Sequence, residues 1–186
     1  MDKTVSILGL AGSLRKGSYN RALLRTASEL VPDDAKLEVF DLEGIPLFNQ
    51  DFENQLPERV KEFKNKIRSA DAVLIVTPEY NYSIPGVLKN AIDWASRPPS
   101  DNAWKGKPVA LMSASTGRFG GARAQYHLRQ CFVFLDMHPL NRPEVMVPNA
   151  KDNFDEQGQL KDEKTKLLVA ELLKGLVTWT RKLKKE

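Results

Sequence analysis

The chain has 186 residues, of which 41% are hydrophobic, and this length supports one substantial hydrophobic core but not two full domains. Its 28 basic and 24 acidic side chains give a formal net charge of +4, and a composition with 28% charged residues excludes disordered, collagen-like and coiled-coil proteins. A single cysteine and two histidines exclude an internal disulfide and a zinc cluster, and no apolar run reaches the roughly 18 residues of a membrane span, so we expect a cytoplasmic protein without metal or membrane contact.

Short runs of β-branched and aliphatic residues alternate with helix-period segments along the whole chain, which is typical of an α/β fold. The first, third and fourth runs are almost wholly apolar, as expected for strands of a parallel sheet that helices cover on both faces. We predict one domain over residues 1–186, with three layers and a five-stranded parallel sheet of order 2-1-3-4-5. The expected strands span residues 5–10, 37–41, 72–77, 109–113 and 144–147.

Apolar residues at helical spacing predict five helices between and after these strands. Their buried stripes begin at Leu23, Val60, Val87, Ala124 and Leu168. Residues 97–108 and 139–159 are the only long connections that we expect, and we interpret both as loops. Cys131 lies on the apolar stripe of the fourth helix, so we expect a buried and unreactive thiol there. We expect His127 and His138 to have packing or surface roles.

The segment that leads out of the first expected strand, residues 9–20, has the chemistry of an anion-binding turn. Gly12 and Gly17 allow close backbone approach. Ser13 and Ser18 offer hydroxyl groups, Asn20 offers an amide, and the helix that follows points free N–H groups at the same place. The segment is not a Walker A motif, because Ser18 stands where the lysine is required, and its glycines lack the dinucleotide-binding spacing. We infer a cradle for one phosphate group, with a turn that only caps the helix as the structural alternative.

Two further loops follow the third and fourth expected strands, and open sheets of this type bind ligands at the carboxyl ends of their strands. The loop at residues 77–86 has two stiffening prolines, while Tyr80 and Tyr82 offer an aromatic surface to a flat polar ring. Prolines at a helix start also have a purely structural explanation. The loop at residues 113–121 is another small-residue turn. Because no nucleophile–base pair, carboxylate pair or metal set accompanies these turns, we predict that any reaction there depends on a cofactor.

Three blocks of the sequence carry a family resemblance. They are GSLRKGSYN at residues 12–20, TPEYNYSIPG with LKNAIDW at residues 77–86 and 88–94, and GGAR at residues 120–123. These blocks resemble the NADPH-dependent FMN reductase family, and most closely its chromate and quinone reductase branch. The likeness extends from about residue 5 to residue 147, and the three blocks show no departure from the family pattern.

The resemblance implies a flavodoxin-like fold with bound FMN. It also implies an NAD(P)H oxidoreductase in which hydride passes from NAD(P)H to the flavin N5, and two electrons then pass to quinone, chromate, azo or similar small-molecule acceptors. The flavin N5 is then the reactive centre, and no side chain is expected to act as the catalyst. The residues implied at the FMN phosphate are Ser13, Arg15, Ser18, Tyr19 and Asn20. Those implied along the isoalloxazine ring are Pro78, Glu79, Tyr80, Asn81, Ser113, Ser115 and Gly117.

A flavodoxin-type electron carrier, which binds FMN without nicotinamide turnover, is the alternative function. Such carriers tend to be acidic, whereas this chain is basic. Arg15, Lys16 and Arg118 near the expected crevice would attract the phosphates of NADPH. The sequence therefore favours the reductase but leaves the preference between NADH and NADPH open.

The sequence bears on two kinds of macromolecular partner, nucleic acid and a second copy of the chain. The small basic excess, part of it in the terminal run 181–185, gives no reason to expect nucleic acid. The family likeness implies a homodimer or homotetramer. Arg97, Arg123 and Glu144 are candidates for ion pairs between its subunits.

Overall fold

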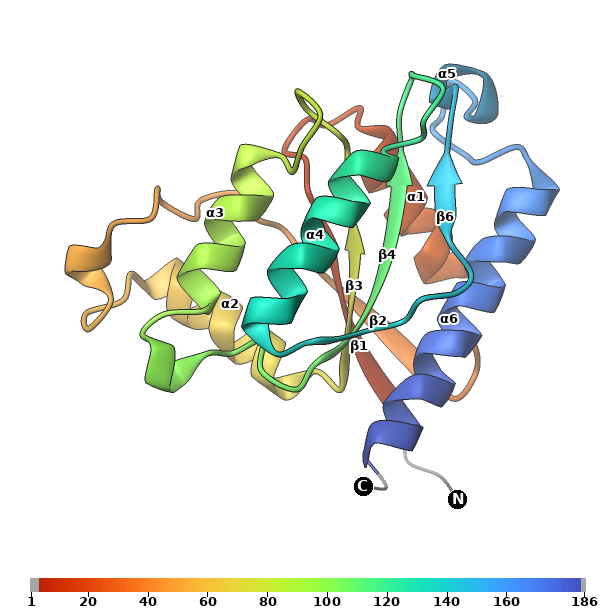
Figure 1. The fold of residues 1–186 in the computed structure, drawn as a ribbon. Coiled ribbons are helices and arrows are strands. Elements are labelled where there is room, and N and C mark those ends of the chain that lie inside the picture. The colour runs from red at the N-terminus through yellow and green to blue at the C-terminus, as the bar shows by residue number, and fades with distance from the viewer. Residues whose placement is uncertain (1–3, 185–186) are drawn as a thin grey trace.

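A parallel sheet lies at the centre of the computed structural model, which describes residues 4–184 (Figure 1). Its strands are β1 (Val5–Ala11), β2 (Ala35–Phe40), β3 (Ala72–Val76), β4 (Pro108–Ala114), β5 (His138–Pro139) and β6 (Val145–Val147). The order is β2-β1-β3-β4-β5, with β6 paired beside β4, and every pairing is parallel. The predicted order 2-1-3-4-5 is therefore confirmed.

Helices cover both faces of this sheet (Figure 1). One layer consists of α1 (Tyr19–Glu29) and α6 (Glu163–Lys184), and the other of α2 (Glu58–Ser69), α3 (Gly86–Ala95) and α4 (Ala122–Leu135). Successive strand residues point to opposite faces, so Ile7 packs in the first core and Leu8 in the second. Among residues 4–184, no helix combines the length and the apolarity needed to cross a bilayer.

The fifth strand position differs from the prediction. We expected one strand at residues 144–147, whereas two short strands pair in turn with β4, β5 beside its start and β6 beside its end. Two residues cannot show a period-2 pattern, and Pro139 has no N–H to donate to a neighbouring strand. For these reasons β5 lies inside a segment that the sequence presents only as a loop. The same segment also contains the short helix α5 (Ala150–Asn153).

A third long connection, residues 41–57, joins β2 to α2, although we expected only two. Its backbone is tied to α3 by side chains. Asn90 accepts a hydrogen bond from the Phe48 amide at 2.7 Å and donates one to the Pro46 carbonyl at 2.8 Å. The Trp94 indole donates to the same carbonyl at 2.8 Å. These anchors satisfy backbone groups that a helix or strand would otherwise pair. The segment is therefore ordered, although its only regular element is the short 3-10 helix η1 (Gln50–Phe52).

Two side chains on the helices also lie differently from the prediction. Leu168 is 39% exposed, and the buried stripe of α6 begins instead at Val169, because adjacent apolar residues leave the exact face of a helix undecided. Cys131 is half-buried, not buried. Its partial burial still raises the pKa of the thiol above its usual value, which favours the neutral, less nucleophilic form.

Candidate functional site

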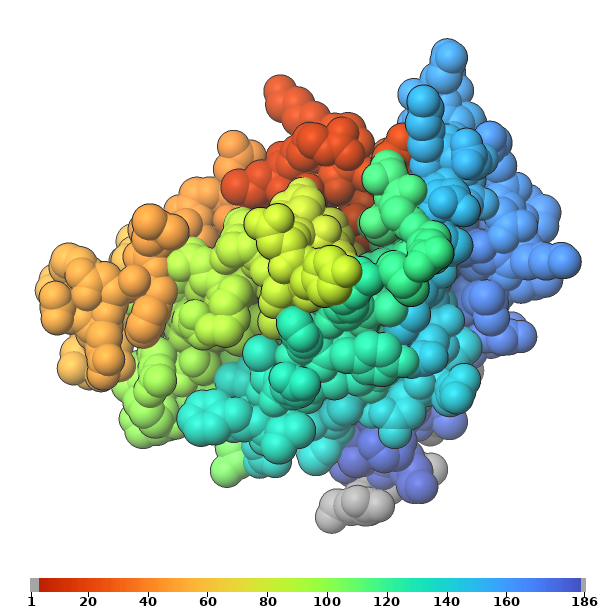
Figure 2. All heavy atoms as spheres, turned by 45° about the horizontal axis from the view of Figure 1, so that its top comes forward, coloured from red at the N-terminus to blue at the C-terminus, as the bar shows by residue number. Residues whose placement is uncertain are grey.

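Three loops meet at the carboxyl edge of the sheet, where β1, β3 and β4 end. Figure 2 shows their surfaces side by side, red for the first loop, yellow-green for the second and green for the third. Between them lies a cavity of about 170 Å³. Its lining residues are Arg15, Ser18, Tyr19, Asn20, Pro78, Glu79, Tyr80, Ala114, Ser115 and Thr116.

The first loop leads into the N-terminus of α1. Ser18 caps this helix, and its hydroxyl accepts a hydrogen bond from the backbone N–H of Asn20 at 3.2 Å. The Ser13 hydroxyl, which is almost fully buried, accepts one from the Arg15 amide at 3.4 Å. The first turn of α1 has no acidic residue, and the Arg15 guanidinium lies 6.0 Å from the ring centroid of Tyr19. The helix dipole and this cation together favour an anion at one end of the cavity.

Gly12 allows the first loop to approach the second. A Cβ at this position would lie 3.0 Å from the Thr77 hydroxyl oxygen and 3.4 Å from the Pro78 ring. The Gly12 amide also donates to the Val76 carbonyl at 2.8 Å, which continues the pairing of β1 with β3 into the loops. A side chain here would therefore push the two loops apart.

The second loop contains a tight two-residue turn. Tyr80 and Ser83 exchange backbone hydrogen bonds of 3.1 and 3.0 Å, and both residues between them have positive φ, 49° at Asn81 and 66° at Tyr82. Positive φ at both central positions is the geometry of a type I′ turn. The turn fixes the backbone that borders the cavity and leaves Tyr80 50% and Tyr82 68% exposed.

Asn20, in the first turn of α1, is hydrogen-bonded to the last residue of β4. Its side-chain amide donates to the Ala114 carbonyl at 2.9 Å, and its oxygen accepts from the Ala114 N–H at 2.8 Å. Both residues are almost fully buried. The Asn20 side chain therefore holds the end of β4 against α1, a role that its implied position at a phosphate does not reveal.

The third loop is shaped by a buried serine and a glycine. The Ser113 hydroxyl donates to a carbonyl of the same loop and accepts from the Gln125 amide at 2.7 Å. Gly121 has φ 88°, and a Cβ there would lie 2.7 Å from the Ser113 Cβ, so both backbone angle and space require glycine. The Ser115 hydroxyl accepts from the Gly117 N–H at 3.1 Å, which closes the turn beside the cavity.

Glu79 connects the second loop to α4. Its carboxylate pairs with the Arg123 guanidinium and accepts a hydrogen bond from the Arg123 N–H at 3.0 Å. Arg123 and Glu144 are two of the residues that the sequence suggests for ion pairs between subunits. Within this chain, Arg123 instead pairs with Glu79, and Glu144 accepts a hydrogen bond from the Tyr126 hydroxyl at 3.2 Å. Both side chains therefore have partners in a single copy of the protein.

The structure brings most of the predicted site residues to one cavity. Ser13, Asn81, Ser113 and Gly117 do not line it, although they shape the loops that do. Ala114 and Thr116 line it and were not predicted; their only sequence signal is that they flank Ser115. Among residues 4–184, no group of three or more His, Cys, Asp or Glu side chains is placed to hold a metal ion.

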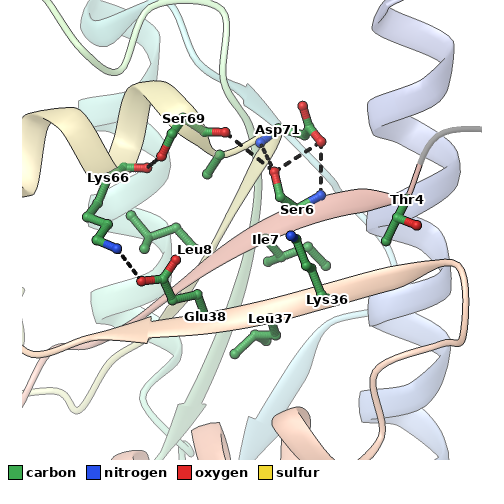
Figure 3. Close-up of a pocket in the computed structure, with 11 residues that line it drawn as sticks. Thr4, Ser6, Ile7, Leu8, Lys36, Leu37, Glu38, Lys66, Ser69 and Asp71 are labelled. Carbon is green, nitrogen blue, oxygen red and sulfur yellow. Dashed lines mark hydrogen bonds and ion pairs between the residues drawn. The ribbon is translucent and has the colours of Figure 1, made fainter.

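A larger cavity, of about 550 Å³, lies toward the other end of the sheet, beside β1, β2 and the end of α2 (Figure 3). Lys66 and Glu38 form an ion pair at this cavity. Asp71 accepts hydrogen bonds from the Ser6 amide at 2.9 Å and from the Ser6 hydroxyl at 3.1 Å. These polar groups satisfy one another, and none of the predicted site residues lines the cavity. The smaller cavity between the three loops is therefore the candidate functional site.

Comparisons with known proteins identify the family of the chain. The family model for NADPH-dependent FMN reductase matches residues 5–152. An NAD(P)H-dependent FMN reductase of Pseudomonas aeruginosa is 54% identical over 185 residues, which cover 99% of this chain and 100% of that protein. A quinone reductase of Pseudomonas putida is 43% identical over 182 residues, covering 97% of each chain. Among solved structures, the flavoenzyme FerB of Paracoccus denitrificans, an NAD(P)H:(acceptor) oxidoreductase, aligns with a TM-score of 0.87 at 35% identity, over 96% of this chain and 98% of that one.

The sheet order, with helices on both faces, defines a flavodoxin-like protein, a fold class in which ligands bind where the strands end. With the family match and these identities, the chain belongs to the NADPH-dependent FMN reductase family, as its sequence blocks indicate. It is an oxidoreductase whose cofactors are FMN and NAD(P)H. The donor set fits FMN, because hydroxyls, a guanidinium and a helix N-terminus without acidic residues suit its phosphate at one end of the cavity.

Proposed function

We propose that the protein transfers two electrons from NAD(P)H, through FMN, to a quinone. The observation that carries this proposal is the convergence of three loops on one cavity at the carboxyl edge, in a chain of this family. The relative from Pseudomonas putida is named a quinone reductase, which supports a quinone as acceptor.

The chain's contribution to this reaction is to position the cofactor and to tune its surroundings. Bound FMN would supply the redox chemistry, with N5 as the atom for hydride transfer from NAD(P)H and two electrons then available to the acceptor. In our proposal the phosphate is bound by Arg15, Ser18 and the first N–H groups of α1, with Ser13, Tyr19 and Asn20 beside them. The stiff backbone of residues 78–81 orients the ring edge, with Ser113, Ser115 and Gly117 nearby. Such positioning lowers the entropic barrier to electron transfer between stacked rings.

The size of the cavity bears on acceptor choice. Its volume of about 170 Å³ is smaller than the roughly 300–1,000 Å³ of typical small-molecule sites, so we propose that it encloses the phosphate end and leaves the ring face accessible. A ring face without specific hydrogen bonds to the acceptor discriminates little among flat or small oxidants. We therefore extend the proposal to chromate and azo compounds as acceptors.

An absorbance spectrum of the purified protein, followed by anaerobic titration with NADPH and with NADH, tests the proposal. We expect a flavin spectrum that bleaches with donor and returns when a quinone is added. A colourless protein that takes up no FMN would contradict the proposal. A flavin that neither donor reduces would identify an electron carrier instead.

We also propose that residues 1–186 act as one domain, and that the protein forms a homodimer or homotetramer in the cytoplasm. Val133 and Phe134 on α4 are each 83% exposed, which supports a second copy covering this face. The single cysteine supports a reducing compartment. Light scattering at micromolar concentration measures the assembly, and a monomer there would contradict this part of the proposal.

A further inference from the structure

The rim of the functional site carries a stack of two arginines and two aromatic rings. The Arg123 guanidinium lies 3.8 Å from the ring centroid of Tyr82 and 4.3 Å from that of Phe119, so it bridges the second and third loops. The Arg118 guanidinium lies over the same Phe119 ring, 4.9 Å from its centroid. Aromatic faces attract cations, so a ring holds each guanidinium in a defined position.

The two guanidiniums differ in how their charges are compensated. Arg123 pairs with the Glu79 carboxylate. Within the described part of the chain, no carboxylate lies at ion-pair distance from Arg118, which is exposed. An aromatic ring carries no net charge, so Arg118 retains its full positive charge. The rim therefore presents an ordered cation with free N–H donors.

Arg118 belongs to a loop that lines the cavity, and this loop is separate from the groups that fit the FMN phosphate. It follows Thr116, a lining residue, by two positions on the third loop. The phosphate-binding groups lie on a different loop, at Arg15 and the N-terminus of α1. Arg118 is thus available for a second anion that enters with a substrate.

We propose that Arg118, held on Phe119, binds the 2′-phosphate of NADPH and gives this enzyme a preference for NADPH over NADH. This inference rests on the nicotinamide-dependent function proposed above. The two donors differ only in that phosphate, which carries between one and two negative charges near neutral pH. A planar guanidinium can pair with a phosphate through two parallel hydrogen bonds. Its stacking on Phe119 reduces the side-chain entropy lost on binding.

Steady-state kinetics of the FMN-loaded enzyme with each donor test the proposal. We expect R118A to lower kcat/KM for NADPH about tenfold and to change kcat/KM for NADH less than about twofold. A tenfold loss is the size expected for a charge-assisted hydrogen bond at a solvent-exposed site. The matched control is K105A, which also removes one exposed positive charge. Lys105 precedes β4, whereas Arg118 follows it, so the two cations lie toward opposite ends of that strand. K105A should leave both values unchanged. Equal losses for both donors in R118A, or no loss for NADPH, would overturn the proposal.

Salt supplies a second kinetic readout. Raising the ionic strength from about 0.05 to about 0.5 M shortens the screening length and weakens an exposed pair. The ratio of kcat/KM for NADPH to kcat/KM for NADH should therefore fall with salt in the parent enzyme. In R118A this ratio should not change with salt. If salt leaves this ratio unchanged in the parent enzyme as well as in R118A, the role of Arg118 is contradicted.

Calorimetric binding of 2′,5′-ADP to the FMN-loaded protein gives a readout that needs no turnover. We expect R118A to weaken this binding about tenfold and to leave the binding of 5′-AMP unchanged. Unchanged 2′,5′-ADP binding would overturn the inference and leave the reductase function standing. A flavin that neither donor reduces would overturn the function itself, and the inference with it.

Discussion

Replacing Asn20 with alanine removes the clamp between α1 and the end of β4. The Asn20 side chain bonds both the N–H and the C=O of Ala114, at 2.8 and 2.9 Å, and both residues are almost fully buried. Each buried backbone group left without a partner costs about 1–3 kcal/mol, which gives about 2–6 kcal/mol for the pair. Water entering the space left by the amide reduces this cost, so we expect N20A to lower the free energy of unfolding by about 3 kcal/mol.

Urea denaturation of the apoprotein measures this loss, with N141A as the matched control. Asn141 is exposed, and its amide oxygen accepts a hydrogen bond from Arg129 at 3.1 Å, so N141A should cost less than about 1 kcal/mol. In thermal unfolding, about 3 kcal/mol corresponds to a fall in Tm of roughly 6–12 °C for a chain of this size. Because Ala114 lines the cavity, N20A should also weaken FMN binding in a fluorescence titration. Equal stability of N20A and N141A would refute this reasoning.

Three further predictions concern a glycine, a helix cap and a carboxylate. G121A should destabilise the protein by more than about 2 kcal/mol in urea denaturation. Alanine there would have an unfavourable positive φ of 88°, and its Cβ would lie 2.7 Å from the Ser113 side chain. A variant as stable as the parent protein would show that the loop relaxes freely. S18A should cost about 1 kcal/mol of stability through the lost cap, and should weaken FMN binding in a fluorescence titration, whereas unchanged FMN affinity would exclude the hydroxyl as a ligand. Burial raises the pKa of Asp71, but hydrogen bonds from Lys184 and Ser6 outweigh it and hold the pKa below its usual value of 3.8. The stabilisation by Asp71 is therefore present above that value and is lost as the pH falls through the lower native pKa. D71N should therefore make the free energy of unfolding fall less steeply as the pH is lowered into the acid range. An unchanged pH dependence in D71N would contradict this assignment.

Most of the sheet and its helix layers could be predicted because their residue patterns are strong. Every residue of β3 is buried, and its sequence is an uninterrupted apolar run of the length and β-branched content expected for a central strand. By contrast, β5 has two residues and a proline, and residues 41–57 are ordered by side chains of α3, not by their own pattern. Those features depend on partners far along the chain, which local periodicity cannot reveal.

The sequence was enough to predict which loops and most of the residues form the candidate site, but not which of these residues are hydrogen-bonded to one another. Family-like blocks gave the loops and most of the lining residues. The bond from Asn20 to Ala114 spans 94 positions, and the pair of Glu79 with Arg123 spans 44, so one sequence identifies these residues without indicating their partners. The positive φ of Tyr82 was equally hidden, because tyrosine is not a residue that signals a type I′ turn.

A crystal structure of the protein purified with its flavin would show directly where FMN is bound. We predict the phosphate within hydrogen-bonding distance of Ser18 and the first N–H groups of α1, with the ring edge along residues 78–81. FMN in the larger cavity, beside Lys36 and Lys66, would contradict this assignment.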